Sequence, residues 1–313
     1  QLEDPDIEKL PAPLKICARM IQTIKDFRIG VHVVSIMCNP ALRERHWIEM
    51  SDVANMDLQP DAGTTLRKII NYNLSCLDEC EIISIGACKE LQLQQSLTAM
   101  MHEWDNVNFS TGEFKNTGIT ILSSIEDVQA LLDEHIIKTL SMRGSAFVKP
   151  SEIEVKEWFN KLMRVQSTIE QWGKVQSTWL YLLPIFSSKD VVAQMPEEGR
   201  YFAQVDTIYK RYMMAVTKQP NVMETAAQPG LLESMNEANE MLENVQIGVN
   251  NYLEKKRLFF PRFFFLSNDE MLEILSETKD PLRVQPHLSK CFEGINRLNF
   301  NENLEATSMI SVE

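Results

Sequence analysis

The feature that most constrains the fold is one long helical repeat of apolar residues. From residue 155 to residue 183 they recur at alternating spacings of three and four, with one polar interruption at Gln176. This spacing places them on one face of an α-helix. Residues 150–154 (PSEIE) have a cap serine with a glutamate three residues later, which predicts the helix start, and Pro184 predicts its end. The apolar positions are Val155, Trp158, Leu162, Val165, Ile169, Trp172, Trp179 and Leu183.

A second apolar repeat covers residues 231–252, and the fold prediction rests on both repeats. Each repeat suits either a dimeric coiled coil or the inward face of a helical bundle. Three tryptophans in the first repeat favour the bundle, because smaller side chains fill the knob positions of a two-stranded coil best. We predict a mainly α fold, an elongated rod of packed helical bundles with one β-hairpin and a short Phe-rich strand. The second repeat comprises Leu231, Met235, Ala238, Leu242, Val245, Val249 and Tyr252.

The remaining chain predicts shorter helices and two groups of subdomains. Apolar residues at helical spacing predict helices over residues 14–37, 64–72 and 77–104. Together with a hairpin they form the predicted N-terminal part, residues 1–150. The predicted C-terminal part, residues 151–313, holds both long repeats and the Phe-rich segment.

A change from helical to alternating period predicts a β-hairpin near residues 106–122. Val107 and Phe109 alternate with polar residues, and Ile119 and Ile121 do so after an Asn- and Gly-containing turn. Period two on both sides of such a turn is typical of an antiparallel pair. Because an isolated two-stranded hairpin is marginal in water, we expect it to dock on helices.

The charge balance bears on the class of partner. The 313-residue chain has 31 basic and 44 acidic residues, a formal net charge of −13. A negative surface repels phosphate, so neither nucleic acid nor an anionic membrane is an expected partner. Direct binding to the acidic surface of tubulin is disfavoured for the same reason. The sequence also has no apolar run long enough to cross a bilayer.

The cysteine pattern favours reduced thiols over a metal site. Cys76, Cys80 and Cys88 are spaced by one and two helical turns, which would suit soft-metal ligands. However, the chain has no C-x-x-C pair and no histidine at zinc-finger spacing. We therefore expect free thiols packed in helical cores and a cytoplasmic location. The absence of an initiator methionine suggests an excerpt from a longer polypeptide.

No motif for nucleotide binding or catalysis occurs in the sequence. A phosphate-binding loop needs a glycine five residues before a Gly-Lys pair and a hydroxyl after it. The pair Gly173-Lys174 has Thr168 and Val175 at those positions, and it lies inside the predicted helix. The five histidines are dispersed. We therefore expect no catalytic, cofactor-binding or metal-binding residues in this part of the protein.

The most informative stretch for function covers residues 259–295 (FFPRFFFLSNDEMLEILSETKDPLRVQPHLSKCFEGI). Its opening, residues 259–266, predicts a short strand whose phenylalanines are buried. Residues 267–270 form a start box, which predicts a helix after it. Arg262 stands among five phenylalanines, so its charge needs a partner or an exit to solvent.

The order of residues in this stretch closely resembles the linker region of dynein heavy chains, most of all the axonemal (ciliary inner-arm-type) chains. Residues 176–186 (QSTWLYLLPIF) and 202–206 (FAQVD) resemble further signatures of that family. One departure is Leu183-Pro184, where the family commonly has Leu-Glu. The resemblance covers most of the chain and is strongest from Trp158 onward.

The resemblance implies a mechanical function. The family's linker is a curved, mostly helical rod that arches over an AAA+ ring, bends when the ring binds ATP, and straightens on product release. It implies a parent motor that hydrolyses ATP with magnesium and moves along microtubules in the axoneme of a cilium or flagellum. The implied partners are the AAA+ ring of the same heavy chain and other dynein subunits bound through the parent tail.

Two sets of candidate residues follow from this resemblance. Pro184, Ser187 and Ser188 form a candidate hinge, because a helix-breaking residue and two small residues follow the longest repeat. An ordinary loop between helices is the equally open alternative. Lys115 and Asn116 in the hairpin turn, together with Arg262, are candidate contacts to the ring or a partner. Simple packing remains the alternative for each.

Two other functions fit part of the sequence. A non-motor helical scaffold or tethering module would share long repeats and negative charge, but it would not be expected to carry the Phe-rich sequence of residues 259–275. A free-standing hydrolase with a diffuse site would show turnover without the ring. An ATPase assay separates that alternative from the lever.

Overall fold

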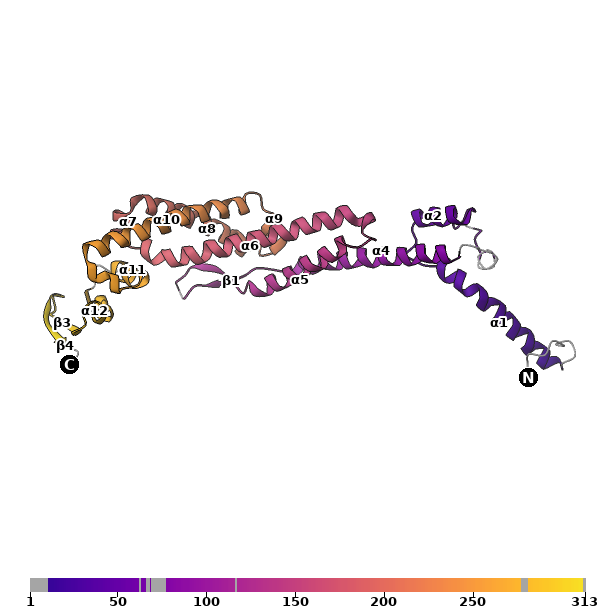
Figure 1. Cartoon of the computed structure of the whole chain (residues 1–313), viewed down its shortest axis with the longest axis horizontal. Coiled ribbons are helices and arrows are strands. Elements are labelled where there is room, and N and C mark those ends of the chain that lie inside the picture. Colours follow the sequence, from indigo (N-terminus) through magenta and orange to yellow (C-terminus); the bar gives the residue numbers. More distant parts are fainter. Residues whose placement is uncertain are drawn as a thin grey trace. The chain divides into compact units, whose positions relative to one another are not determined.

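The computed structural model describes residues 11–61, 63–65, 68, 77–115, 117–276 and 281–311. The chain divides into two compact units. The first unit comprises Gln1–His102 and Ile137–Trp158, and the second comprises Glu103–Ile136 and Phe159–Glu313. The helices and strands of both are labelled in Figure 1. The two predicted parts, residues 1–150 and 151–313, stay a prediction.

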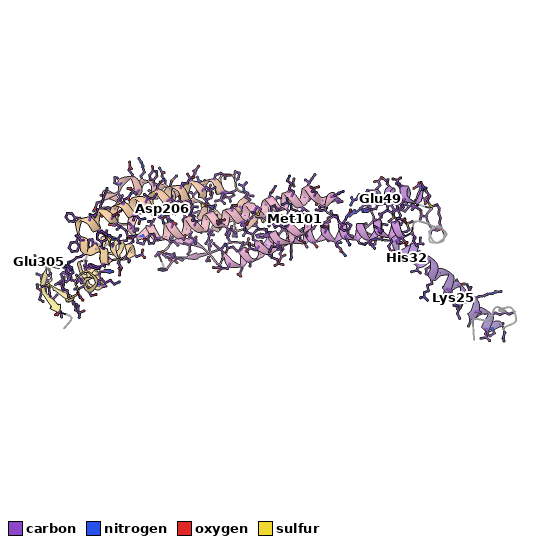
Figure 2. All side chains as sticks on the ribbon, viewed as in Figure 1. Lys25, His32, Glu49, Met101, Asp206 and Glu305 are labelled. Carbon is purple, nitrogen blue, oxygen red and sulfur yellow. The ribbon has the colours of Figure 1, made fainter. Side chains whose placement is uncertain are left out.

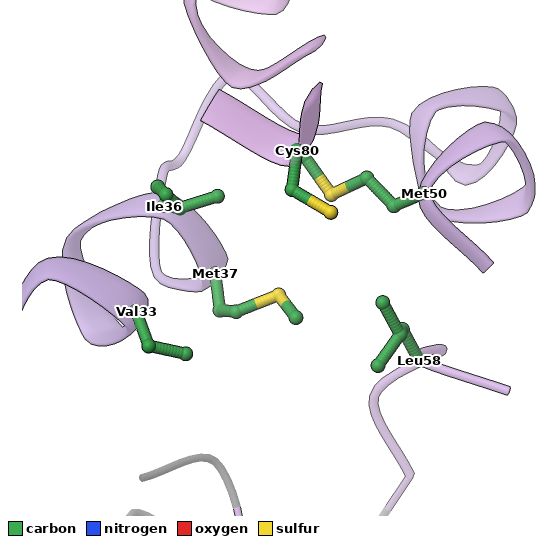
Figure 3. Packing of buried hydrophobic residues seen from close by; sticks show 6 residues of the cluster. All are labelled: Val33, Ile36, Met37, Met50, Leu58 and Cys80. Atoms are coloured by element: carbon green, nitrogen blue, oxygen red, sulfur yellow. The ribbon is translucent and has the colours of Figure 1, made fainter. Parts of the chain in front are cut away.

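The first unit is built on α1 (Ala12–Met37), α2 (Glu44–Ala54) and most of α4 (Leu77–Glu103). The predicted helices over residues 14–37 and 77–104 are thereby confirmed. The one predicted over residues 64–72 lies mostly outside the described residues. Side chains from α1, α2, α4 and the loop after α2 meet in a small core, shown in Figure 3. Its buried members are Val33, Ile36, Met37, Met50, Leu58 and Cys80.

The middle of α1 presents apolar side chains to solvent. Met20, Ile24 and Phe27 are 60%, 63% and 45% exposed. Two turns later Val33, Ile36 and Met37 are buried in the core described above. The apolar stripe of this helix therefore contributes to the described core only at its C-terminal end.

A side-chain amide joins the end of α1 to α4. Asn39 Nδ2 donates to the Ser84 carbonyl (3.0 Å) and to Ser84 Oγ (2.7 Å). Its Oδ1 accepts from the Ala41 N–H at 3.0 Å, which closes a local turn. The Asn39-Pro40 break that ends α1 thus also ties the end of that helix to α4.

The second unit contains most of the long helices and both hairpins. It includes the greater part of α5 (Glu126–Arg143) and of α6 (Glu152–Phe186). Its other elements are η2 (Trp104–Asn106), β1 (Ser110–Glu113), β2 (Thr120–Ser123), α7 (Lys189–Gln194), α8 (Pro196–Lys218), α9 (Val222–Ala227), α10 (Leu231–Phe259), η4 (Pro261–Phe265), α11 (Asn268–Ser276), η5 (Pro281–Val284), α12 (Gln285–Cys291), β3 (Ile295–Phe300) and β4 (Ala306–Ser311).

The two apolar repeats form the core of this unit, as predicted for a helical bundle. On α6, Leu162, Val165 and Trp172 are fully buried, and Trp179 is fully buried two further turns on. On α10, every apolar position of the repeat from Leu231 to Val249 is at most 3% exposed. Side chains this closely packed resist bending of the helices, because any kink would open voids between them.

One buried amide pair joins α6 to α10. Asn239 is 5% exposed, and its Nδ2 donates to the Gln171 carbonyl (3.1 Å) and to Gln171 Oε1 (2.9 Å). A buried amide left without partners is costly, so this pair specifies one alignment of the two helices.

The predicted β-hairpin is confirmed, with its strands later in the chain than the alternating residues suggested. β1 and β2 pair antiparallel, from Ser110 opposite Ser123 to Glu113 opposite Thr120. The backbone of the residues just before β1 bonds to residues 220–222, at the start of α9. The Phe109 N–H donates to the Pro220 carbonyl (2.8 Å), and the Val222 N–H donates to the Val107 carbonyl (3.0 Å).

Two further features differ from the sequence prediction. The prediction of a Phe-rich strand is wrong, because α10 continues to Phe259 and the next residues form the 3-10 helix η4. Pro261 has no N–H for a strand ladder, whereas its fixed φ suits the first turn of a helix. In addition, a second hairpin, β3 with β4, was not predicted.

We expect the α6 repeat to dominate the stability of the second unit. Leu162→Ala should lower its free energy of unfolding by about 2–5 kcal/mol, because a fully buried leucine leaves a cavity. The adjacent Met163 is 37% exposed, and Met163→Ala is the matched control with a much smaller effect. Urea unfolding followed by circular dichroism measures both. Equal losses in the two variants would contradict this assignment of the buried face.

Candidate functional site

The first candidate site is the joint after α6. The predicted helix end at Pro184 is wrong, because the helix continues to Phe186 with Pro184 inside it. Pro184 cannot donate to the carbonyl one turn before it, a loss that costs about 3 kcal/mol in a helix interior. Burial offsets this cost, since Ile185 and Phe186 are 4% and 9% exposed and Phe186 stacks on Phe202.

The two serines make the change of direction between α6 and α7. Ser187 is held to the end of α6, where its N–H and Oγ both donate to the Leu183 carbonyl, at 3.0 and 2.7 Å. Ser188 is extended (φ −81°, ψ 118°) and is the N-cap residue of α7. The three candidate hinge residues therefore lie together where one helix passes into the next.

Close packing surrounds this joint. Val191 and Met195 of the α7 segment are 3% and 4% exposed. A Cβ built on Gly199 would lie 3.0 Å from Val192 Cγ1, so α7 and the start of α8 approach closely. A bend at this joint must therefore either move α7 and the start of α8 together or separate Val192 from Gly199.

The second candidate site is the hairpin, which docks on helices through Gln176. The Leu122 N–H donates to Gln176 Oε1 (2.8 Å), and Gln176 Nε2 donates back to the Leu122 carbonyl (3.0 Å). Tyr209 Oη also donates to Gln176 Oε1, at 2.7 Å. The one polar residue in the α6 repeat is thus the partner of a strand backbone. The expected docking of the hairpin is confirmed.

An aromatic pair lies next to this hydrogen-bond network. Trp179 and Tyr209 stack with ring centroids 4.3 Å apart, and both are at most 1% exposed. Burial raises the pKa of the Tyr209 hydroxyl well above its ordinary value, so the group stays a neutral donor toward Gln176.

A second polar contact holds the chain before the hairpin. Asn221 is the N-cap residue of α9, and its side chain accepts from the Glu224 N–H. Its Nδ2 donates to the carbonyls of Trp104 (3.2 Å) and Asp105 (3.1 Å). Trp104 Nε1 in turn donates to the buried His135 at 2.9 Å. These contacts connect residues far apart in sequence, which is why sequence reasoning missed them.

The hairpin turn presents Lys115 to solvent. Lys115 has a positive φ of 45°, and its Nζ lies 5.2 Å from the Phe114 ring centre. Gly118 takes the left-handed conformation that glycine accepts readily, with φ 74°. Asn116, the other candidate in the turn, lies outside the described residues.

Arg262 has intramolecular partners. Its Nη1 donates to the Cys291 carbonyl at 2.9 Å, and its guanidinium lies 4.7 Å from the Phe292 ring centre. The expected partner of this charge is therefore found between η4 and α12. Sequence reasoning missed Arg257, whose Nη2 donates to the Leu266 carbonyl at 3.0 Å and ties η4 to the end of α10.

The expected burial of the Phe-rich segment is wrong for three of its phenylalanines. Phe259, Phe264 and Phe265 are 90%, 59% and 69% exposed. Only part of the segment packs, since Phe260 and Phe263 meet edge to face and Leu266 is buried. The short 3-10 turn points successive side chains in three directions, so one core cannot cover them all.

The predicted start box of the following helix is confirmed. The Ser267 N–H donates to Glu270 Oε2 (2.8 Å), and the Glu270 N–H donates to Ser267 Oγ (3.3 Å). Lys290 of α12 also bonds Glu270. The lysine first, and then the Ser267 N–H, hold the pKa of Glu270 at about 2, below its ordinary 4.5.

The thiols and other metal-ligand types are distributed as follows. Cys80 and Cys291 are buried, Cys88 is half-buried, and Cys17 and Cys38 are exposed. Cys76 lies outside the described residues. Burial raises the pKa of the Cys291 thiol, which keeps it protonated. Within the described residues, no three His, Cys, Asp or Glu side chains gather closely enough to hold a metal ion.

Among the described helices, none has the length and apolar character needed to cross a bilayer.

Comparison with known proteins identifies one family. A family model described as "Dynein heavy chain, N-terminal region 2" matches residues 3–313. The chain is 56% identical over 273 residues to dynein axonemal heavy chain 12 of Mus musculus, which is 87% of this chain and 9% of that protein. It is 48% identical over 308 residues to dynein axonemal heavy chain 3 of Homo sapiens, with 98% and 8% covered. The chain thus spans less than a tenth of these relatives' length.

The hairpin dock yields one prediction. Gln176→Leu should leave the Leu122 N–H and carbonyl without their side-chain partners, which costs about 1–3 kcal/mol per buried group. Hydrogen exchange should therefore become faster in β1 and β2 and stay unchanged in α10. Ser177→Ala is the control, because Ser177 Oγ bonds its own helix, at the Lys174 carbonyl, and no other element that the structure describes. Unchanged exchange in the hairpin would show that Gln176 does not hold it.

The Glu270 cluster yields a pH prediction. Its carboxylate binds its partners when ionised, so the stabilisation is full above the ordinary pKa of 4.5 and is lost as the pH falls toward 2. Glu270→Gln should therefore be less stable than the parent at pH 7, and the difference should shrink between pH 4.5 and pH 2. Urea unfolding over this range measures it, and Lys290→Met should reproduce the loss at pH 7. A difference at pH 2.5 as large as the one at pH 7 would contradict this origin.

Proposed function

This chain belongs to the dynein heavy chain family, and we propose that it is the mechanical linker of an axonemal motor, a lever that bends and straightens over an AAA+ ring. The observation that carries the proposal is the match of one dynein region, N-terminal region 2, to residues 3–313. The relatives are named as axonemal heavy chains, which supports an axoneme location in a cilium or flagellum.

The packing of the second unit supports a load-bearing function. The apolar positions of the α6 repeat from Leu162 to Trp179 are at most 3% exposed, and α6 is 35 residues long. A lever must transmit displacement rather than absorb it. Long helices packed at the density of an organic crystal have that stiffness.

We propose that the bend lies at Pro184, Ser187 and Ser188. Here α6 lacks one backbone hydrogen bond and the chain changes direction at an extended residue. Hinges concentrate at element ends, where a few residues absorb the change in φ and ψ. The joint closed by Phe186 and Phe202 then gives the straight state its stability.

The parent motor would supply the chemistry. ATP and magnesium would bind the AAA+ ring of the same heavy chain, and this part would carry no catalytic residue. We propose that Lys115, Asn116 and Arg262 lie on the surfaces toward the ring or other dynein subunits. The exposed Phe259, Phe264 and Phe265 beside Arg262 offer apolar surface for such a contact.

The test is a distance measurement in the complete heavy chain. Fluorophores at the exposed positions Ser177 and Glu197 lie on either side of the proposed hinge. Their separation should differ between the nucleotide-free motor and the motor with an ATP analogue, because the hinge lies between them. A pair at Lys161 and Ser177, both on α6, is the matched control and should not change. A constant separation for the first pair would contradict the placement of the hinge.

The lever hypothesis also predicts that the isolated chain does not hydrolyse ATP. A steady-state assay on residues 1–313, compared with the complete heavy chain, measures this. Turnover by the isolated chain would contradict the proposal.

A further inference from the structure

A cavity of about 470 Å³ lies between the first hairpin and α8. Its walls come from three elements of the second unit: residues 118–120 of the hairpin, Trp179 of α6, and α8 from Tyr209 to Lys218. We call it the hairpin groove. Its volume is within the range of natural ligand pockets, roughly 300–1,000 Å³, and is larger than one aromatic side chain needs.

The lining of the groove is apolar at its base and basic at its rim. Trp179, Tyr209 and Met213 line it and are at most 3% exposed, whereas Met214 is 62% exposed. Methionine adapts its shape to a partner, which suits a surface that receives another chain. Lys210 and Lys218 also line the groove, and both are exposed.

The charge around the groove contrasts with the rest of the protein. The chain carries a net charge of −13, yet no Asp or Glu occurs in its sequence from Thr207 to Met223, a stretch with Lys210, Arg211 and Lys218. Two carboxylates approach from outside this stretch. Asp206, labelled in Figure 2, pairs with Lys210 at 2.8 Å. Glu113 accepts from the Gly118 N–H at 2.6 Å. The Lys218 end of the groove therefore has the stronger attraction for an anion.

From these features we infer that the hairpin groove binds a peptide segment of a partner protein that has large apolar side chains between acidic residues. The apolar side chains fill the space above Trp179 and Met213, and the flanking carboxylates meet Lys218 and Lys210. Such a segment would hold the hairpin against α8. The inference does not depend on the lever function, because it rests on the groove alone.

The probe is the fluorescein-labelled peptide acetyl-EEFLEE-amide, whose binding to the full 313-residue chain is measured by fluorescence anisotropy. Binding should be at least about tenfold tighter than for acetyl-SSFLSS-amide and acetyl-EEGSEE-amide, and acetyl-KKFLKK-amide should not bind. Methyl NMR signals of Met213 and Met214 should shift on binding, while that of the buried Met235 stays unchanged. Equal binding of the neutral and acidic peptides, or no binding, would overturn the inference.

Two variants locate the binding at the groove. Met214→Glu and Lys218→Glu should each weaken binding of the acidic peptide about tenfold, since each places a carboxylate at the rim. Ile247→Glu on α10, where Ile247 is 59% exposed, is the matched control and should bind like the parent. Circular dichroism should show unchanged helix content in all three. Equal weakening by Ile247→Glu would overturn the assignment to this groove.

Self-association is tested separately. If sedimentation showed the parent chain to be a dimer and Met214→Glu a monomer, the occupant would be a second copy of the chain. That result would overturn the inference of an acidic partner peptide. A monomeric parent that binds the peptide supports it.

Discussion

The hydrogen bonds of Gln176 organise the second unit. A glutamine in the middle of an apolar helix face would be costly to bury without partners. Here its amide satisfies both backbone groups of Leu122 and accepts from Tyr209, so strand, α6 and α8 are fixed at one point. The hairpin and α8, which both bond this amide, also line the hairpin groove.

The periodic part of the structure was predictable because helix burial follows sequence spacing directly. The α6 and α10 repeats, the first hairpin and the Ser267–Glu270 start box each depend on residues close together in the chain. The contacts of Gln176 and Asn221 depend on residues 54 and 116 or more positions away. Sequence could mark Gln176 as an exception within its repeat, but it could not identify the strand that the amide would meet.

Two of the wrong predictions arise where local rules compete. Pro184 predicts a helix end, yet burial of Ile185 and Phe186 extends α6 past it. The aromatic run 259–265 predicts a strand, yet the preceding helix continues into it and Pro261 starts a 3-10 turn. In both places the local backbone preference was outweighed. Side-chain burial outweighed it at Pro184, and the preceding helix outweighed it in residues 259–265. The exposed phenylalanines and the candidate hinge are the result, so the errors fall where function is proposed.

The amide pair between Asn239 and Gln171 has a consequence for sliding. Ridges of apolar side chains alone would let α10 shift along α6 by one turn, about 5.4 Å, into an equivalent fit. Such a shift would strip the Asn239 side chain of both its acceptors at once. The amide pair therefore fixes one alignment of the two helices. Tension along their axes is transmitted without one helix sliding past the other.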